Sequence, residues 1–443
     1  MMNIQLSDHF TYKKLMRFTL PSIAMMIFTS IYGVVDGFFV SNFVNETAFA
    51  SVNFIFPFLM VLGAVGFMLG SGGCALIART FGEGKPEKAR SLFSMVVYIS
   101  IGVGVTLAVL AFIFIRPIAE WLGAEGEMLE YCVLYARINL VALPALLLQY
   151  EFQSFFVTAE KPQLGLYVTI AAGVTNMVLD ALLVGVLPLG LAGAAIATAM
   201  SQVIGGLVPL LYFARPNSSL LRLTRPVFDG RALVRVCTNG SSEFLSNISM
   251  SVVGMLYNAQ LMKYAQQNGV AAYGVLMYVN FVFISYFIGY SIGTAPIVSY
   301  HYGAGNYKEL KSLMKKSLVI VGVVSVIMLL LGEGLARPLS SIFVGYNAEL
   351  FNMTLRGFFI YSFSFLFAGL AIFASSFFTA LNNGFLSALI SFLRTALFQV
   401  VAVLVLPLFF ELDGIWLSVV VAEAAATLVA VIVLLANRKR YKY

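Results

Sequence analysis

Long apolar segments dominate this sequence, and few charged residues are available to cover a water-soluble core. Of the 443 residues, 60% are hydrophobic and only 11% are charged, which gives a mean hydropathy of +0.92. Soluble domains usually contain about 25% charged residues. Most of the outer surface must therefore face lipid, and the sequence predicts an all-α membrane protein.

Twelve segments are long and apolar enough to cross a bilayer, which takes about 20 residues per helix. Gly, Pro or Asn marks most of the breaks between them, as at 84–86, 267–269 and 382–384. The predicted spans are 15–43, 49–79, 91–115, 130–157, 163–187, 191–214, 234–262, 271–301, 315–336, 351–380, 385–409 and 414–436.

The basic residues indicate the orientation. If the N-terminus is cytoplasmic, 21 of the 27 Lys and Arg residues lie on the cytoplasmic side. The six exceptions are Arg116, Lys263 and Arg337 in outer loops and Arg137, Arg356 and Arg394 within spans. Cytoplasmic loops carry such an excess. We therefore expect a multi-pass membrane protein with both termini in the cytoplasm, and the net charge of +7 requires no nucleic acid as a partner.

The second half of the chain repeats the first at an offset of about 221 residues. The matching segments are 81–92 with 302–313, 154–156 with 376–378, and 187–189 with 406–408. Six spans per repeat place both repeats in the same orientation, related by a pseudo-two-fold axis along the membrane normal. We expect one six-helix lobe at 1–214, a cytoplasmic linker at 215–233 and a second six-helix lobe at 234–443. Transporters often use this arrangement, with substrate between the two bundles.

Ionisable side chains inside a membrane span are costly, and they are functional candidates for that reason. The spans contain six such candidates: Asp36, Glu151, Asp180, Glu243, Arg394 and Glu423.

Two of these acids have a polar neighbour one helical turn earlier. Tyr32 precedes Asp36 in the first span, and Asn176 precedes Asp180 in the fifth. The helical rise places both acids in the outer half of the membrane. If the two spans pack together, their carboxyls share one site, and neighbouring carboxylates at low dielectric favour a bound proton. Two separately satisfied structural carboxyls are the alternative.

The other candidates have weaker contexts. An ion pair between Glu243 and Arg394, with Asn247 one turn away, could be a gate or a neutral structural pair. Glu151 lies between two glutamines and could line an inner cavity. We expect a structural role for Glu423.

Several catalytic arrangements lack the residues that they need. Three cysteines and two histidines are too few and too scattered for a metal site or a histidine triad. The segment Gly289–Gly293 has the G-x-S-x-G spacing of a hydrolase, but it lies within a span, so we interpret it as helix packing. Gly63, Gly66, Gly70 and Gly73 also indicate close packing. No phosphate-binding loop is present, so ATP is not the expected energy source. An intramembrane enzyme is therefore a weak alternative.

The ordered set of motifs resembles the multidrug and toxic compound extrusion (MATE) family, nearest its MepA-like branch. The similarity covers essentially the whole chain. It rests on Pro21, Val35-Asp36-Gly37, Val52-Asn53-Phe54, Pro57, Gly82-Glu83-Gly84, Ala89, Asn176, Asp180, Gly193-Ala194-Ala195, Ala197-Thr198 and Tyr302-Gly303-Ala304-Gly305.

The resemblance implies a cation-coupled antiporter that exports amphipathic, often cationic, drugs and dyes by alternating access. It also implies a location in the bacterial cytoplasmic (inner) membrane. In proton-linked relatives the residue matching Asp36 is protonated. The residues matching Tyr32, Asn176, Asp180 and Thr198 surround it, and the proline matching Pro21 lets the first span bend.

Some relatives use sodium through acids in spans 7 and 10, and span 10 has no acid after Glu349. A proton is therefore the preferred coupling ion, with Na⁺ as the alternative and no further cofactor.

We expect a monomer that acts on small molecules. A flippase for lipid-linked precursors remains a second hypothesis, and Arg394 would be its cation.

Overall fold

The computed structural model describes residues 4–443, except for the side chains of residues 34, 36–38, 41, 42 and 46. Within the described residues the chain is almost entirely helical and contains no strand. The predicted all-α class is therefore confirmed.

The helices divide into two consecutive groups. The first group consists of α1 (Tyr12–Phe43), α2 (Glu46–Gly82), α3 (Pro86–Leu122), α4 (Gly126–Val141), α5 (Leu143–Thr158), α6 (Pro162–Asp180), the π-helix η1 (Ala181–Val186) and α7 (Gly190–Ala214). The second group consists of α8 (Gly230–Gly303), α9 (Tyr307–Val344), α10 (Ala348–Tyr361), α11 (Ser364–Ala380), α12 (Gly384–Phe392), the π-helix η2 (Leu393–Leu397), α13 (Phe398–Val405) and α14 (Pro407–Tyr441).

These helices account for twelve spans. Within the described chain, nine helices have the length and hydropathy of a span, and up to 11 do if the bent pairs α4–α5 (60°) and α10–α11 (49°) each count as one. The 74 residues of α8 would extend roughly 110 Å at 1.5 Å per residue, far more than one bilayer. The chain reverses within α8 at Gln266, where φ is 51°. This helix therefore contributes two spans, and the reversal falls one residue before the predicted break.

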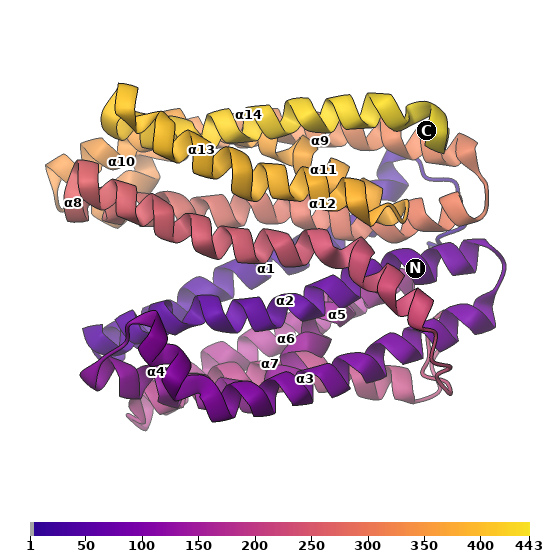
Figure 1. The fold of residues 1–443 in the computed structure, drawn as a ribbon, viewed down its shortest axis with the longest axis horizontal. Coiled ribbons are helices and arrows are strands. Elements are labelled where there is room, and N and C mark those ends of the chain that lie inside the picture. Colours follow the sequence, from indigo (N-terminus) through magenta and orange to yellow (C-terminus); the bar gives the residue numbers. More distant parts are fainter. Residues whose placement is uncertain (1–3) are drawn as a thin grey trace.

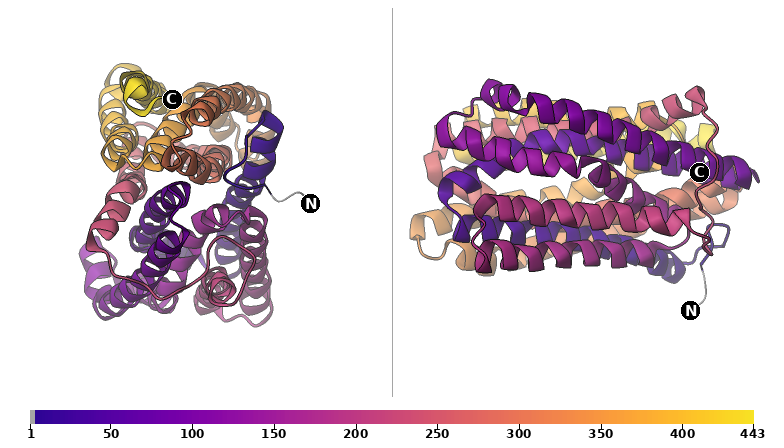
Figure 2. Two further views of the ribbon diagram at one scale, coloured as in Figure 1. Left: turned by 90° about the vertical axis from the view of Figure 1, so that its right-hand side faces the viewer. Right: turned by 90° about the horizontal axis from the view of Figure 1, so that it is seen from below.

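The two groups form two bundles that lie side by side (Figure 1). The chain termini lie at the same end of the molecule, which we call the terminal end (Figures 1 and 2). A non-helical segment, residues 215–229, connects α7 to α8 and crosses the first bundle at this end (Figure 2).

The duplication is visible in the backbone. Left-handed φ values recur in pairs at an offset of 221 or 222 residues. The pairs are Gly84 with Gly305, Glu160 with Asn382, and Gly190 with Glu411. The two bent spans break at Ala142 and at Phe363, again 221 residues apart. Equivalent turns and bends therefore shape both bundles, although few side chains are shared.

Glycines bring helices together within the first bundle. A Cβ added at Gly66 would lie 2.6 Å from the carbonyl oxygen of Leu147, and one added at Gly70 would lie 2.8 Å from Cα of Glu151. Both glycines belong to α2 and both neighbours to α5. The close packing predicted for the glycine row of the second span is confirmed.

Glycines also join the two bundles near the terminal end. A Cβ added at Gly82 would overlap the carbonyl oxygen of Tyr300, and one added at Gly303 would overlap that of Arg79. These two contacts are equivalent under the 221-residue repeat, so the pseudo-two-fold axis passes between α2 and α8. Gly289, in the hydrolase-like segment, packs against α1 in the same way, since a Cβ added there would lie 2.6 Å from Cα of Ile23. This confirms that the segment serves helix packing.

Candidate functional site

The acid predicted in the fifth span lies inside the first bundle. Asp180 is fully buried at the end of α6, and Asn176 is 2% exposed one turn before it. Nearly one turn further back, Gly173 lets α6 approach α1, since a Cβ there would lie 2.9 Å from Cδ1 of Tyr32. The structure therefore brings Tyr32 of the first span next to the helix that carries Asn176 and Asp180.

The remaining members of the predicted site lie on α1 and α7. Asp36 belongs to α1, one turn after Tyr32, but its side chain lies outside the described residues. Thr198 is half-buried on α7, which packs along α6. Pro21 is a buried residue inside α1, and the helix continues through it from Tyr12 to Phe43.

A π-helical turn follows the buried acid directly. Asp180 is the residue before η1, Ala181–Val186. A second π-helix, η2, contains Arg394 in the other bundle. Single π-turns inside α-helices are frequent at functional sites, because the extra residue turns the following side chains to a new direction. No pattern in the sequence indicated either turn.

The ion pair predicted between Glu243 and Arg394 is wrong. Arg394 instead contacts Glu423 of α14, with its Nε 2.8 Å from Oε2 and 3.1 Å from Oε1. Arg394 lies in η2 and Glu423 lies on a different helix 29 residues later, a pairing that spacing along one helix could not anticipate. Both partners are largely buried, at 16% and 7% side-chain exposure. Glu423 therefore neutralises Arg394, which agrees with the structural role expected for it.

The two other gate candidates of the second bundle lie on α8. Glu243 is half-buried, and its backbone carbonyl accepts a hydrogen bond from the side-chain amide of Asn247 at 2.8 Å. Further along the same bundle, the hydroxyl of Tyr257 donates to Oε1 of Gln399 at 2.6 Å. Tyr257 stands at the repeat position of Asp36, so this uncharged pair occupies the region that corresponds to the acidic site of the first bundle.

Glu151 does not line an open cavity, contrary to the prediction. It is fully buried on α5, and the Ser100 hydroxyl of α3 faces its carboxyl. Within the described residues neither carboxyl oxygen makes a hydrogen bond of normal length. Gln149 is also buried, and it packs against Gly205 of α7. The glycine brings α7 against this side of α5, so the space that the sequence could assign to a cavity is filled.

The N-terminal segment ties the two bundles together at the terminal end. The backbone N–H of Leu6 donates to Glu160 of the first bundle at 2.6 Å, and that of Phe10 donates to Glu309 of the second at 2.9 Å. Lys316 of α9 donates to the carbonyl of Phe10. Leu6 and Phe10 are both fully buried. We call residues 6–10 the N-terminal strap. The sequence did not predict its contacts, because no spacing rule connects residues 150 or 300 positions apart.

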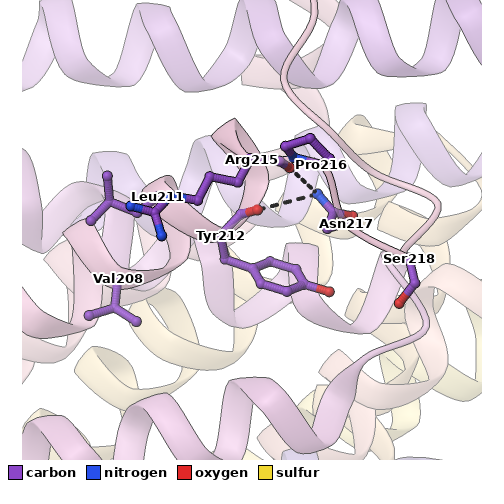
Figure 3. Close-up of a pocket in the computed structure, with 7 residues that line it drawn as sticks. All are labelled: Val208, Leu211, Tyr212, Arg215, Pro216, Asn217 and Ser218. Atoms are coloured by element: carbon purple, nitrogen blue, oxygen red, sulfur yellow. Dashed lines mark hydrogen bonds between the residues drawn. The ribbon is translucent and has the colours of Figure 1, made fainter.

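A separate hollow of about 530 Å³ lies at the terminal end of α7 (Figure 3). The Asn217 amide donates to the carbonyls of Tyr212 and Arg215, at 3.3 and 3.1 Å, and so shapes the turn by which the chain leaves the helix. The other lining residues are Val208, Leu211, Pro216 and Ser218. None of the predicted site residues lies here.

No group of three His, Cys, Asp or Glu side chains that could hold a metal ion occurs among the described residues. The buried polar groups described above include the carboxyl and amide of α6, Glu151 and Gln149 of α5, and the neutralised pair on η2 and α14.

Two bundles of six spans, related by a pseudo-two-fold axis along the membrane normal, make this protein a twelve-helix, two-lobe membrane protein. The same fold is found in a MATE protein solved in complex with MaL6, with a TM-score of 0.93, 21% identity and coverage of 100% of this chain and 99% of that chain. It is also found in a multidrug resistance MATE family transporter of the MOP superfamily solved in an outward-facing conformation. That structure gives a TM-score of 0.92 and 22% identity, covering 100% and 98% of the two chains.

The MatE family model matches residues 21–182 and again residues 244–405. The chain therefore belongs to the MatE family, and each half carries one copy of the domain. Among the curated relatives, the multidrug export protein MepA of Staphylococcus haemolyticus is 26% identical over 440 residues, which cover 97% of this chain and 94% of that protein. MepA of Staphylococcus aureus strain N315 is 23% identical over 442 residues, with the same coverage.

Proposed function

We propose that this protein is a proton-coupled antiporter that exports amphipathic, often cationic, small molecules. The observation that carries the proposal is the buried carboxyl of Asp180, placed beside Asn176 and next to the part of α1 that holds Tyr32 and Asp36. The relatives named multidrug export protein support the substrate class. Membership of a transporter family favours transport over catalysis.

The proposed cycle is alternating access between lobes 1–214 and 234–443, joined by a linker at 215–233. The positive-inside distribution supports a cytoplasmic terminal end. The glycine contacts of α2 with α8 and the N-terminal strap both close that end. The state described here is then outward-facing, and export ends when a cation reaches Asp36 and Asp180 and α1 bends at Pro21.

A proton suits this site better than sodium in the second bundle. Within α10 and α11 the only acid is Glu349, in the first turn of α10. The position that repeats Asp36 is Tyr257, which is committed to Gln399. The second bundle therefore supplies few anionic ligands for Na⁺, whereas one buried carboxyl is enough to carry a proton.

The flippase hypothesis required Arg394 as a free cation, and Arg394 is paired with Glu423. A lipid-linked phosphate would require an available positive charge in the central region, and Arg394 is neutralised by Glu423. Drug export requires no such charge.

The test is ethidium efflux from vesicles that contain the purified protein. A proton gradient is imposed in one set of vesicles and a sodium gradient in another. We expect the proton gradient alone to drive efflux, and Asp36→Asn to abolish it at unchanged protein content. Asp413→Asn is the matched control, because this carboxyl lies outside the site and pairs with Arg356. Full efflux by Asp36→Asn would refute the coupling scheme, and efflux driven by neither gradient would refute drug export.

A further inference from the structure

A second cavity lies between the two bundles at the terminal end, and its lining is strongly basic. Its volume is about 630 Å³, within the range of small-molecule sites. Five cations line it: Arg79 and Lys88 from the first bundle, and Arg231, Arg235 and Arg440 from the second. Only two carboxylates, Glu83 and Asp229, share the lining. The cavity therefore carries an excess of positive charge.

Both carboxylates already accept hydrogen bonds from other groups. Glu83 accepts from Arg79 at 3.1 Å, and Asp229 accepts from the backbone N–H of Ala232 at 3.0 Å, which caps α8. Among the described residues the other four cations form no ion pair with a carboxylate. Topology alone requires basic residues on this side of the membrane, but it does not require them to converge on one hollow from α3, α8 and α14.

The same cavity contains the start of a helix. Asn383 caps α12, and Gly384 and Phe385 form its first turn in the lining. The positive end of a helix dipole favours an anion at this point. The planar guanidinium of arginine can donate two parallel hydrogen bonds to phosphate oxygens, and a helix N-terminus also binds phosphate.

The cavity lining also includes an exposed apolar side chain. Phe385 is 76% exposed. An exposed apolar ring beside cations can lie against the acyl chains of a lipid whose anionic headgroup the cations bind. A phosphate could therefore arrive on a lipid headgroup as well as from solution.

The geometry points to a binding site for a phosphate-bearing anion, held between the two bundles by Arg231, Arg235, Arg440 and Lys88. Because both bundles line the cavity, a bound phosphate stabilises the arrangement in which the terminal end is closed. The site is separate from Asp36 and Asp180, so the proposal holds whichever ion drives export.

Native mass spectrometry of the full-length protein tests this site with three probes: dioctanoyl phosphatidylglycerol, dioctanoyl phosphatidylcholine and inorganic pyrophosphate. We expect one equivalent of phosphatidylglycerol to bind more tightly than phosphatidylcholine. The double variant Arg231→Ala, Arg235→Ala should weaken binding by about tenfold or more, since each arginine supplies charge-assisted hydrogen bonds. Binding of pyrophosphate as well, with the same sensitivity, would identify a site open to soluble phosphates.

The matched control is Arg222→Ala, Arg225→Ala. It removes the same charge from the neighbouring segment, but neither residue lines the cavity. Lys88→Gln, on the opposite bundle, provides a second variant if the first does not fold, as judged by thermal unfolding in neutral detergent. Equal weakening in the control, equal binding of the two lipids, or no binding of any probe would overturn the proposal.

Discussion

Closure of the terminal end should depend on Gly82 of α2 and Gly303 of α8, which let the two helices come into backbone contact. A Cβ added at Gly82 would overlap the carbonyl oxygen of Tyr300 and lie 2.9 Å from the backbone nitrogen of Ala304. A Cβ added at Gly303 would overlap the carbonyl oxygen of Arg79 and lie 2.9 Å from its carbon. Both obstacles are backbone atoms, which cannot turn aside as a flexible side chain could. Gly82→Ala or Gly303→Ala must therefore push the two bundles apart at this end.

The cost can be worked from these distances. Unstrained contact between carbon atoms needs about 3.5 Å, so the helices have to separate by at least roughly 0.6 Å, and more at the overlapping oxygens. Overpacking of this kind costs about 1–3 kcal/mol, which corresponds to about a 5- to 150-fold change in the ratio of closed to open molecules. One separation relieves both overlaps. We therefore expect the double variant to be little worse than either single variant, and a double-mutant cycle would show strong coupling.

The assay is a distance measurement between the two bundles. Spin labels at Glu87→Cys and Lys308→Cys, both exposed and equivalent under the repeat, report the separation at the terminal end. The half-exposed native Cys237 is replaced by serine so that only these two sites react. Double electron–electron resonance should show a longer and broader distance in each glycine variant than in the parent protein.

The control is Gly102→Ala on α3, where an added Cβ meets nothing within 4 Å. This change should leave the distance unaltered and slightly favour the helix. If Gly82→Ala and Gly303→Ala gave the parent distance distribution and the parent efflux rate, closure would not depend on these contacts and the reasoning would fail.

Three further predictions concern stability. Glu423→Gln leaves Arg394 buried without its partner and should cost about 3–5 kcal/mol, seen as a lower Tm, whereas Glu423→Gln combined with Arg394→Met should recover most of it. Burial raises the pKa of Glu160, although the hydrogen bond from the Leu6 backbone acts in the opposite direction. The folded protein therefore holds this proton more tightly than the unfolded chain. The resulting stabilisation is fully present below the unfolded pKa, near 4.3, and is lost as pH rises through the higher folded pKa. The Tm of the parent protein should therefore fall across that window relative to Glu160→Gln, and parallel Tm curves would contradict this. Gly66→Ala in α2 should lower the Tm, because its Cβ would lie 2.6 Å from a carbonyl oxygen of α5, and an unchanged Tm would show that α2 can shift without loss.

The composition and the hydropathy pattern determine the fold class of this protein. A chain with 11% charged residues has to place its surface in lipid, and a lipid-exposed backbone has to be helical or part of a closed barrel. The number of spans follows from the same pattern. The duplication predicted the pseudo-two-fold axis, because the segment around Gly82 has a recognisable copy around Gly303, and the structure places these two glycines in equivalent contacts.

The candidate site could be predicted only where residues one helical turn apart define it. Asn176 and Asp180 lie on one face of one helix, so spacing alone brings them together, and Gly173 then places Tyr32 beside them. The partner of Arg394 could not be predicted in this way. Arg394 and Glu423 lie on two different helices, so no spacing rule along one helix pairs them.

The tertiary structure alone decided which distant segments meet at the terminal end. The strap from Leu6 to Phe10 reaches Glu160 and Glu309, and basic residues from α3, α8 and α14 converge on one cavity. Sequence patterns report the environment of a residue along its own helix, because helical periodicity is a local property. Contacts between helices hundreds of residues apart depend on how the two bundles pack, and that packing is set by the sum of many weak interactions, which no short motif encodes.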